Sequence, residues 1–218
     1  MKVNLLHTTP LWIAPLAIRT CYDSNGKSDT HAGMIGPKDA ALIKSIVKSG
    51  HTSTVEHINY AFMIEGISRG CLQELARHRH ASLSVQSSRY TLKKLLMGLI
   101  DLDELLVPSG NKIADNLAQV QLRSVAFAAD RHNIPNDQLK YALPEAYKTI
   151  LVWSINARSL RNFFTLRMSE RAHWEIRKLA FEVFGAIPND HVILYEDVVM
   201  PHLEKVAERQ LEVQNAAA

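Results

Sequence analysis

The chain has 218 residues, with 25 lysines and arginines against 22 acidic residues, and 47% of its residues are hydrophobic. This composition excludes an intrinsically disordered chain, because enough apolar surface is available to offset the entropy of folding. The uncharged N-terminal stretch is interrupted by His7, Pro10 and Pro15, so neither a membrane span nor a secretory leader is expected. Two cysteines cannot form a disulfide framework, and we expect a soluble cytoplasmic protein with reduced thiols.

The first part of the chain combines strand and helix patterns. A short strand is expected over 2–7 and a helix over 11–22, followed by a polar loop over 23–36. A second helix is expected over 37–48, because proline stands in its first turn and Gly50 follows its end.

The middle of the chain continues this mixture. Residues 58–64 alternate and are rich in β-forming side chains, which predicts a strand, whereas 67–78 carries apolar residues at helical spacing. The serine-rich stretch 82–91 has no strong period and predicts a loop or an irregular strand. A helix is expected over 116–131.

The last third of the chain is dominated by helical patterns. Residues 149–155 form either a buried strand or the start of a helix, since periodicity does not separate the two. Residues 156–184 are strongly helical and predict two helices that meet near Ser169. Because no repeat or linker interrupts the sequence, we expect one domain over 1–218. Its class is α/β (α+β), with long helices around a modest sheet and no Rossmann motif.

Positive charge is concentrated in two segments. Residues 75–100 hold five basic and no acidic side chains, and residues 156–178 hold six basic against two acidic. Since the whole chain is at +3, the remaining residues carry −6. Most charge runs are simply solvated surface, but this concentration favours an anionic partner, either nucleic acid or a phosphorylated small molecule.

Several common chemistries lack their sequence signatures. The sequence holds no G-x-G-x-x-G motif, P-loop or H-x-x-x-H pair, so no metal is expected and a nucleotide cofactor needs another kind of site. Cys71 lies on the apolar side of its predicted helix, which favours a core residue over a nucleophile.

The most informative stretch covers residues 73–90. A predicted helix leads into Arg77-His78-Arg79, and four serines follow before Arg89. Guanidinium groups bind phosphate bidentately, and serine hydroxyls and loop amides add short donors. This combination suits the phosphate of a nucleotide.

Three blocks of this sequence occur together in the order of one known family. RHR at 77–79, followed after seven residues by Ser87, matches an R-H-R-x7-S signature. HTSTVEH at 51–57 is similar to H-x-[ST]-x-x-E-H, and NARSLRNFFTLR at 156–167 is similar to N-A-R-S-L-x-N-F-x-x-L-R. By these blocks the chain resembles the flavin-dependent thymidylate synthases.

The resemblance implies a methyltransferase of nucleotide biosynthesis that converts dUMP to dTMP. Methylenetetrahydrofolate would supply the carbon, FAD would carry the hydride and NADPH would reduce the flavin. It also implies a homotetramer with active sites at subunit interfaces and no nucleic-acid or membrane partner. All these ligands are anionic, which would explain the two basic segments, and a flavin held at an interface needs no Rossmann fingerprint.

The resemblance also assigns ligand-binding residues. Arg77 and Arg89 would clamp the phosphate, and Arg167, the catalytic candidate, would stabilise negative charge on the uracil ring. Ser87 would bind ligand rather than act as a nucleophile, because its neighbours in the sequence supply no base. The dUMP-binding set is Gln73, Glu74, Arg77, Gln86, Ser87, Ser88, Arg89, Lys140 and Arg167. The FAD-binding set is His51, Ser53, Arg77, His78, Arg79, Asn156, Arg158 and Asn162.

Purely structural roles are open for several of these side chains. Asn156 could cap its helix, and Ser53 and Ser87 could satisfy turn backbone. Glu56 and His57 are expected to form a structural hydrogen-bonded pair rather than a catalytic one.

The sequence departs from the family pattern at a few positions. Val85 stands where many members carry Glu or Gln, and Arg171 where a histidine is familiar. A glutamine is usual three residues before the Arg-His-Arg triplet; here Glu74 stands at that position and Gln73 one residue earlier, so either could reach the site. Lys140 replaces an arginine and keeps its charge without the fork.

Two other functions are open on the sequence alone. A nucleic-acid-binding protein could use the basic segment 77–94, which would make binding strongly salt-dependent. A catalytically silent homologue could bind nucleotide as a regulator, a hypothesis suggested by Val85.

Overall fold

A computed structural model describes residues 1–96 and 101–216, with the side chains at 93–96, 103 and 209–216 left out. The side chains of Lys93 and Lys94, which belong to the first basic segment, therefore lie outside the described residues. No helix within the described ranges is long and apolar enough to cross a membrane. In chain order the main elements are β1 (Lys2–Thr8), α1 (Ile13–Cys21), α2 (Pro37–Ser49), η2 (Thr52–His57), β2 (Asn59–Ser68), α3 (Arg69–Leu75), β3 (Ala81–Val85), α4 (Ser88–Leu96), α5 (Lys112–Arg131), α6 (Asn136–Leu139), η4 (Lys140–Ala142), β4 (Lys148–Asn156), α7 (Ala157–Arg167), α8 (Trp174–Gly185), η5 (Asn189–Leu194) and α9 (Glu196–Ala216).

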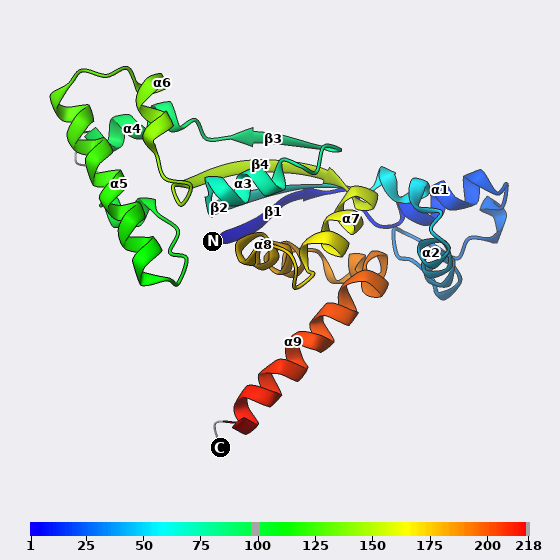
Figure 1. Ribbon diagram of the computed structural model, residues 1–218. Helices are drawn as coiled ribbons and strands as arrows, with labels where there is room; N and C mark the ends of the chain where they lie inside the picture. Colours follow the sequence, from blue (N-terminus) through cyan, green and yellow to red (C-terminus); the bar gives the residue numbers. More distant parts are fainter. Residues whose placement is uncertain (97–100, 217–218) are drawn as a thin grey trace. The chain divides into compact units, whose positions relative to one another are not determined.

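The strands form one small antiparallel sheet in the order β1-β2-β4-β3 (Figure 1). The central strands β2 and β4 alternate between buried and less buried residues, because successive side chains of a strand point to opposite faces. Burial of one face of each strand fixes its register. The expected α/β (α+β) class, with helices around a modest sheet, is confirmed.

The chain folds into two compact units, and β2 and β4 contribute residues to both. Unit 1 consists of residues 1–2, 63–77 and 83–152, and unit 2 of residues 3–62, 78–82 and 153–218.

The core of unit 1 lies beneath α5. It contains Leu92, Leu122, Val125, Leu139 and Tyr147, none of them more than 4% exposed. The Tyr147 hydroxyl donates a hydrogen bond to Thr91 Oγ1 at 3.0 Å, while burial raises the pKa of Tyr147. A hydroxyl that stays protonated can keep donating, so this bond fastens α4 to the start of β4.

The core of unit 2 is aromatic. Trp153 of β4 meets Phe163 of α7 edge to face at 5.1 Å between ring centroids, and Phe164 meets Tyr195 in the same way at 5.3 Å. Edge-to-face geometry adds to the free energy gained by burying such large rings. On the far side of α7, Arg161 holds both carboxylate oxygens of Asp197 at 2.7 Å, which fastens α9 to α7.

Two aspartates attach the loop before α2 to the rest of unit 2. Asp29 accepts hydrogen bonds from the backbone amides of Lys38 and Asp39 at 2.8 and 2.9 Å. It therefore caps the helix from a distance, since the first amides of a helix have no partner within it.

Asp39 itself is fully buried in the first turn of α2. It accepts from Arg19 Nε at 2.5 Å and from the hydroxyls of Ser28 and Thr30 at 2.6 Å each. Burial opposes its ionisation, but the hydrogen bonds from Ser28, Thr30 and Arg19, with the charge of Arg19, lower its pKa to about 2. The carboxylate is thus the centre that organises the loop.

Most expected elements are present with shifted ends. The stretch 149–155, which periodicity left open, is strand β4, and the region 156–184 forms the two helices α7 and α8 on either side of Ser169. The helix expected over 116–131 starts at Lys112, because the Asn111 side chain accepts from the amides of the next turn.

Two expectations in the middle of the chain were wrong in part. The helix expected from Ile67 starts at Arg69, because β2 continues to Ser68, whose hydroxyl then caps α3 by accepting from Cys71 N at 2.9 Å. The stretch 82–91 was predicted to be a loop or an irregular strand: it holds most of strand β3, as the second alternative has it, but also the first turn of α4, which was not predicted. Serine is a poor helix former in isolation but is suited to the start of a helix.

Candidate active site

The two candidate ligand sets divide between the two units. The dUMP set lies in unit 1 apart from Arg167, and the FAD set lies in unit 2 apart from Arg77. Within unit 1 the candidates come from α3, the β3–α4 junction and η4, and within unit 2 from η2, α7 and the segment 78–79. Nearly all residues of each set therefore belong to a single unit.

The end of α3 presents one anchored and one exposed side chain. Gln73 donates its amide to both carboxylate oxygens of Glu145 at 2.9 Å. Glu74 lies 3.7 Å from Arg77, whose side chain is 72% exposed. Sequence reasoning named Gln73, Glu74 and Arg77 but missed Glu145, which lies 72 residues from its partner.

The junction of β3 and α4 brings several candidates to a helix start. Gln86 N donates to Ile150 O at 2.8 Å, which continues the pairing of β3 with β4. The Ser87 carbonyl accepts from Tyr90 N at 3.1 Å, so its backbone forms the turn that leads into α4. Ser88 is 8% exposed. The first amides of a helix and its positive dipole end favour an anion.

Lys140 and Arg89 lie on neighbouring segments of unit 1. Asn136 of α6 donates to the Arg89 carbonyl at 3.1 Å, and α4 also contacts η4, which Lys140 opens. The Lys140 ammonium lies 5.6 Å from the ring centroid of Tyr141. Both cationic side chains are exposed, so the structure places two positive charges on adjoining surface segments.

The start of α7 is fastened to η2 within unit 2. Asn156 Oδ1 accepts from Ser159 N at 2.9 Å and so caps α7, which is the structural role left open for it. Arg158 Nη1 donates to Glu56 Oε1 at 2.6 Å. Glu56 was expected to pair with His57; its ion pair is with Arg158 instead, 102 residues away.

The remaining candidates of the FAD set in this region are exposed. His51 directly precedes η2 and Ser53 lies within it. Asn162 follows Arg158 by one turn of α7, and both side chains reach solvent. Residues four apart share a helical face, so the amide and the guanidinium are available to the same ligand.

Arg167, at the end of α7, is held by His78. Its Nε donates to Nε2 of the imidazole at 2.9 Å. The His78 ring is 9% exposed and meets Phe163 edge to face at 5.0 Å. The structure thus brings together two sequence-predicted residues from different blocks, and it presents more of Arg79 than of His78 to solvent.

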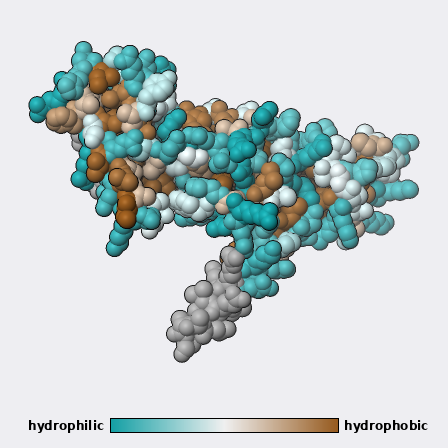
Figure 2. Space-filling view, in the orientation of Figure 1, coloured by the Kyte–Doolittle hydropathy of each residue, from teal (hydrophilic) through white to brown (hydrophobic). Residues whose placement is uncertain are grey.

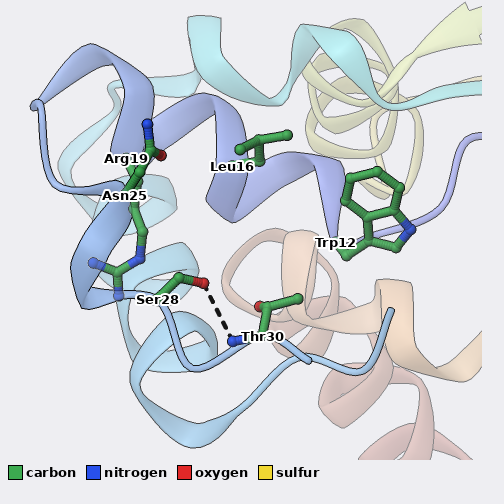
Figure 3. A pocket seen from close by; sticks show the side chains of 6 residues that line it. All are labelled: Trp12, Leu16, Arg19, Asn25, Ser28 and Thr30. Carbon is green, nitrogen blue, oxygen red and sulfur yellow. Dashed lines mark hydrogen bonds between the residues drawn. The ribbon is translucent and has the colours of Figure 1, made fainter. Parts of the chain in front are cut away.

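A separate pocket of about 180 Å³ lies beside α1 (Figure 3). Its lining includes Trp12, Leu16 and Arg19, and the Ser28 hydroxyl in its wall accepts from Thr30 N at 3.2 Å. None of the candidate ligand-binding residues lines it. Across the part of the chain that the structure describes, no group of three or more His, Cys, Asp and Glu side chains could hold a metal ion.

Comparison with known proteins decides the family. The family model described as "Thymidylate synthase complementing protein" matches residues 4–188. A flavin-dependent thymidylate synthase from Helicobacter pylori is 46% identical over 208 residues, covering 90% of this chain and 98% of that protein. The chain belongs to the flavin-dependent thymidylate synthases. One from Campylobacter jejuni is 44% identical over 212 residues, covering 94% of this chain and 100% of the relative.

Solved structures agree with this membership in a family of methyltransferases. A flavin-dependent thymidylate synthase from Helicobacter pylori, complexed with FAD and dUMP, superposes with a TM-score of 0.83 at 47% identity. The match covers 91% of this chain and 100% of that one. The fold of this family member is therefore shared along nearly its whole length, whereas α9 lies beyond the residues matched by the family model.

Proposed function

We propose that this chain converts dUMP to dTMP, with methylenetetrahydrofolate as the carbon donor, NADPH as the reductant and FAD as the hydride carrier. One observation carries the proposal: a solved relative 47% identical to this chain is described as complexed with FAD and dUMP. The site chemistry supports it, because each unit offers a set of cationic and hydrogen-bonding side chains suited to an anionic nucleotide.

The dUMP set of unit 1 binds the substrate phosphate and base. The exposed guanidinium groups of Arg77 and Arg89 clamp the phosphate bidentately, and Ser87 and Ser88 add their hydroxyls and the first amides of α4. Lys140 contributes a further positive charge. The amide or carboxylate groups that complete this set are those of Gln73, Glu74 and Gln86.

Arg167 acts on the uracil ring. A cation beside the ring stabilises the negative charge that develops as C5 becomes nucleophilic, and such preorganised charge is among the largest contributions to enzymatic rate. The hydrogen bond to His78 fixes the direction of the guanidinium before substrate arrives. Arg167 is therefore the residue to which we assign a catalytic role.

The FAD set of unit 2 holds the flavin together with Arg77. Its donors fit such a ligand, since exposed arginines suit a diphosphate and exposed amide, hydroxyl and imidazole groups suit a ring rich in carbonyl oxygens and nitrogens. When bound and reduced by NADPH, FAD would supply the hydride for the reaction. Arg158 is oriented by Glu56, and Asn162 shares its helical face. The members of this set in unit 2 are His51, Ser53, His78, Arg79, Asn156, Arg158 and Asn162.

No enzyme nucleophile takes part in this proposal. Cys71 is fully buried within α3, so its thiol is a core group and not a reactive one. Ser87 binds ligand through its hydroxyl. The hydride would instead go directly from the reduced flavin to the activated uracil.

The proposal includes a homotetramer with active sites at subunit interfaces, in which residues 1–218 act as one catalytic domain. It also includes a cytoplasmic location, which two free cysteines support. The anionic partners of the basic segments are the nucleotides and folate, and not nucleic acid.

The visible absorption spectrum of the purified protein tests the proposal, first with added FAD and then with dUMP. We expect a bound flavin whose spectrum shifts when dUMP is added, and tritium release from 5-tritiated dUMP once methylenetetrahydrofolate and NADPH are present. Flavin binding without turnover would favour the silent homologue. No flavin binding, together with DNA or RNA affinity that falls steeply with salt, would favour the nucleic-acid-binding protein.

A further inference from the structure

Arg177 belongs to the second basic segment but to neither candidate ligand set. It lines a pocket of about 150 Å³ that we name the α8–α9 pocket, because most of its lining residues come from those two helices. All of these residues lie within unit 2, and none of the candidate ligand-binding residues is among them. The pocket is therefore a feature of the molecule that the proposed function does not use.

Each of the two helices contributes polar and apolar side chains to the pocket. On α8, Arg177 and Phe181 are four residues apart, so they share a helical face. On α9, His202 lies three residues before Lys205 and four before Val206, which brings these three to one side of that helix. The lining thus combines basic groups with an apolar surface.

The charge of the pocket is positive. Arg177 Nη1 donates to the Glu170 backbone carbonyl at 3.2 Å, which orients the guanidinium without neutralising it. Among the residues that the structure describes, the side chains of His202 and Lys205 have no hydrogen-bond or ion-pair partner. Glu170 sets one negative charge in the lining against the two of Arg177 and Lys205. Figure 2 shows mainly hydrophilic side chains, in teal, at the start of α9, and the excess of positive charge favours an anionic ligand.

The walls of the pocket are held in place within unit 2. Arg161 of α7 binds both carboxylate oxygens of Asp197 at 2.7 Å, and Asp197 lies in the first turn of α9. Met168, which follows the last residue of α7, is only 2% exposed and adds an apolar wall. Because these walls are arranged before a ligand arrives, little free energy is lost in ordering them.

We propose that the α8–α9 pocket binds a small organic anion, with its carboxylate or phosphate between Arg177 and Lys205 and its apolar part against Phe181 and Val206. The guanidinium offers a bidentate contact, the ammonium adds a point charge, and His202 has a ring N–H to donate in either protonation state. Two ligands of the proposed reaction carry such a group on a ring system: the folate ends in an aromatic acylglutamate, and NADPH bears a phosphate on its adenosine. The choice between these two sources rests on the proposed function, whereas the binding itself does not.

Titration calorimetry of the full chain with ligand fragments tests the binding. The probes are para-aminobenzoylglutamate and adenosine 2′-phosphate, with para-aminobenzamide as a neutral analogue that keeps the ring and lacks the carboxylates. We expect one of the two anions to bind and the neutral analogue not to bind. Lys205→Glu, at an exposed position, and Arg177→Gln should each raise the dissociation constant at least tenfold. Lys178→Gln, exposed beside Arg177 but outside the lining, should leave it unchanged. Binding of neither anion, or binding that Lys205→Glu does not weaken, would overturn the proposal.

Steady-state kinetics of the same variants identify the source of the anion. If para-aminobenzoylglutamate is the fragment that binds, Lys205→Glu should raise the KM for methylenetetrahydrofolate more than the KM for dUMP. If adenosine 2′-phosphate binds, the KM for NADPH should rise instead. The fragment titrations need neither flavin nor turnover. A chain that turns over dUMP but binds neither fragment would therefore contradict the pocket alone, and a chain that binds a fragment without turnover would contradict only the proposed function.

Discussion

The two units differ in how closely their candidate ligand-binding arginines are held by neighbouring side chains. In unit 1 the Arg77 guanidinium is 72% exposed, and its carboxylate neighbour Glu74 is 3.7 Å away. In unit 2, Arg158 is bound to Glu56 at 2.6 Å and Arg167 to His78 at 2.9 Å. Ordering a long side chain on binding costs free energy that an anchored side chain has already lost. The comparison indicates that the arginines of unit 2, among them Arg167 of the dUMP set, are oriented by close partners, whereas Arg77 of unit 1 is not.

The largest effect is expected on the reaction rate, from a substitution of Arg167 in unit 2. Arg167→Ala should lower the rate of tritium release from 5-tritiated dUMP by about 10²–10³-fold, since a preorganised charge at the reacting ring is lost. Flavin should stay bound, as its visible spectrum would report. Arg167→Lys, which retains the charge without the fork, should recover part of the rate. Near-normal release by the alanine variant would show that Arg167 has no role in the reaction.

A comparable effect is expected on stability alone. Asp39→Asn leaves the buried Arg19 without its charge partner and should lower the free energy of unfolding by about 3 kcal/mol in urea titrations. Asp29→Asn, which weakens only the cap of α2, should cost about 1 kcal/mol. Folded Asp39→Asn protein should keep its turnover, because Asp39 is in neither ligand set; a selective loss of flavin would tie this loop to the site.

The Asp39 carboxylate also makes the free energy of unfolding depend on pH. The pKa of Asp39 is about 2 in the folded protein against an ordinary value of 3.8, so the unfolded chain binds the proton more readily. The stabilisation is complete above about pH 4 and is lost as pH falls toward the folded pKa. Acid unfolding of Asp39→Asn protein should therefore lose part of its pH dependence in this window; an unaltered profile would show that other groups control it.

An intermediate effect is expected from the exposed arginine of unit 1. Arg77→Lys should weaken dUMP binding by about 1–3 kcal/mol, because the bidentate contact is lost while the charge remains. Glu56→Gln in unit 2 should weaken flavin binding by only about 1 kcal/mol or less, since an exposed ion pair contributes little. Titration calorimetry with each ligand measures both. Arg77 belongs to both sets, so the division between the units is tested by Glu56→Gln, and a loss of dUMP affinity in this variant as large as its loss of FAD affinity would contradict it.

The smallest effect on turnover is expected at Cys71. Cys71→Ala should retain catalytic activity, because the thiol is a packing group in the core, at a cost of about 1 kcal/mol in stability. A folded but inactive variant would mean that a thiolate mechanism operates after all.

Local signals explain which parts of the fold were predictable from sequence. α2 was predicted nearly to the residue, because Pro37 opens it and Gly50 ends it with a φ of 80°. The sequence did not decide whether 149–155 is a strand or a helix. This stretch is strand β4 because it pairs with β2 and β3, which are distant in sequence. The start of α4 was missed because serine is scored as a loop residue unless its position at a helix start is recognised.

The site shows the same division between local and distant information. The ligand-binding residues in the blocks around His51, Arg77 and Asn156 were implied by the resemblance of these blocks to the motifs of the family. The partners that orient those residues were not indicated: Glu145 lies 72 residues from Gln73, and Arg158 lies 102 residues from Glu56. Such pairs form only when the chain folds, as when η2 packs against α7. A short segment of sequence cannot indicate them, because it never contains both residues of the pair.

The contact between Arg167 and His78 also determines where a proton lies. A guanidinium Nε–H has no lone pair to offer, so the imidazole must present a bare Nε2 to receive it. The ring is therefore the neutral tautomer protonated at Nδ1. Nitrogen chemical shifts of the His78 ring would show this directly, with one protonated and one unprotonated resonance. The residue between the two arginines of the RHR block is thus an uncharged acceptor, set into the most cationic stretch of the chain.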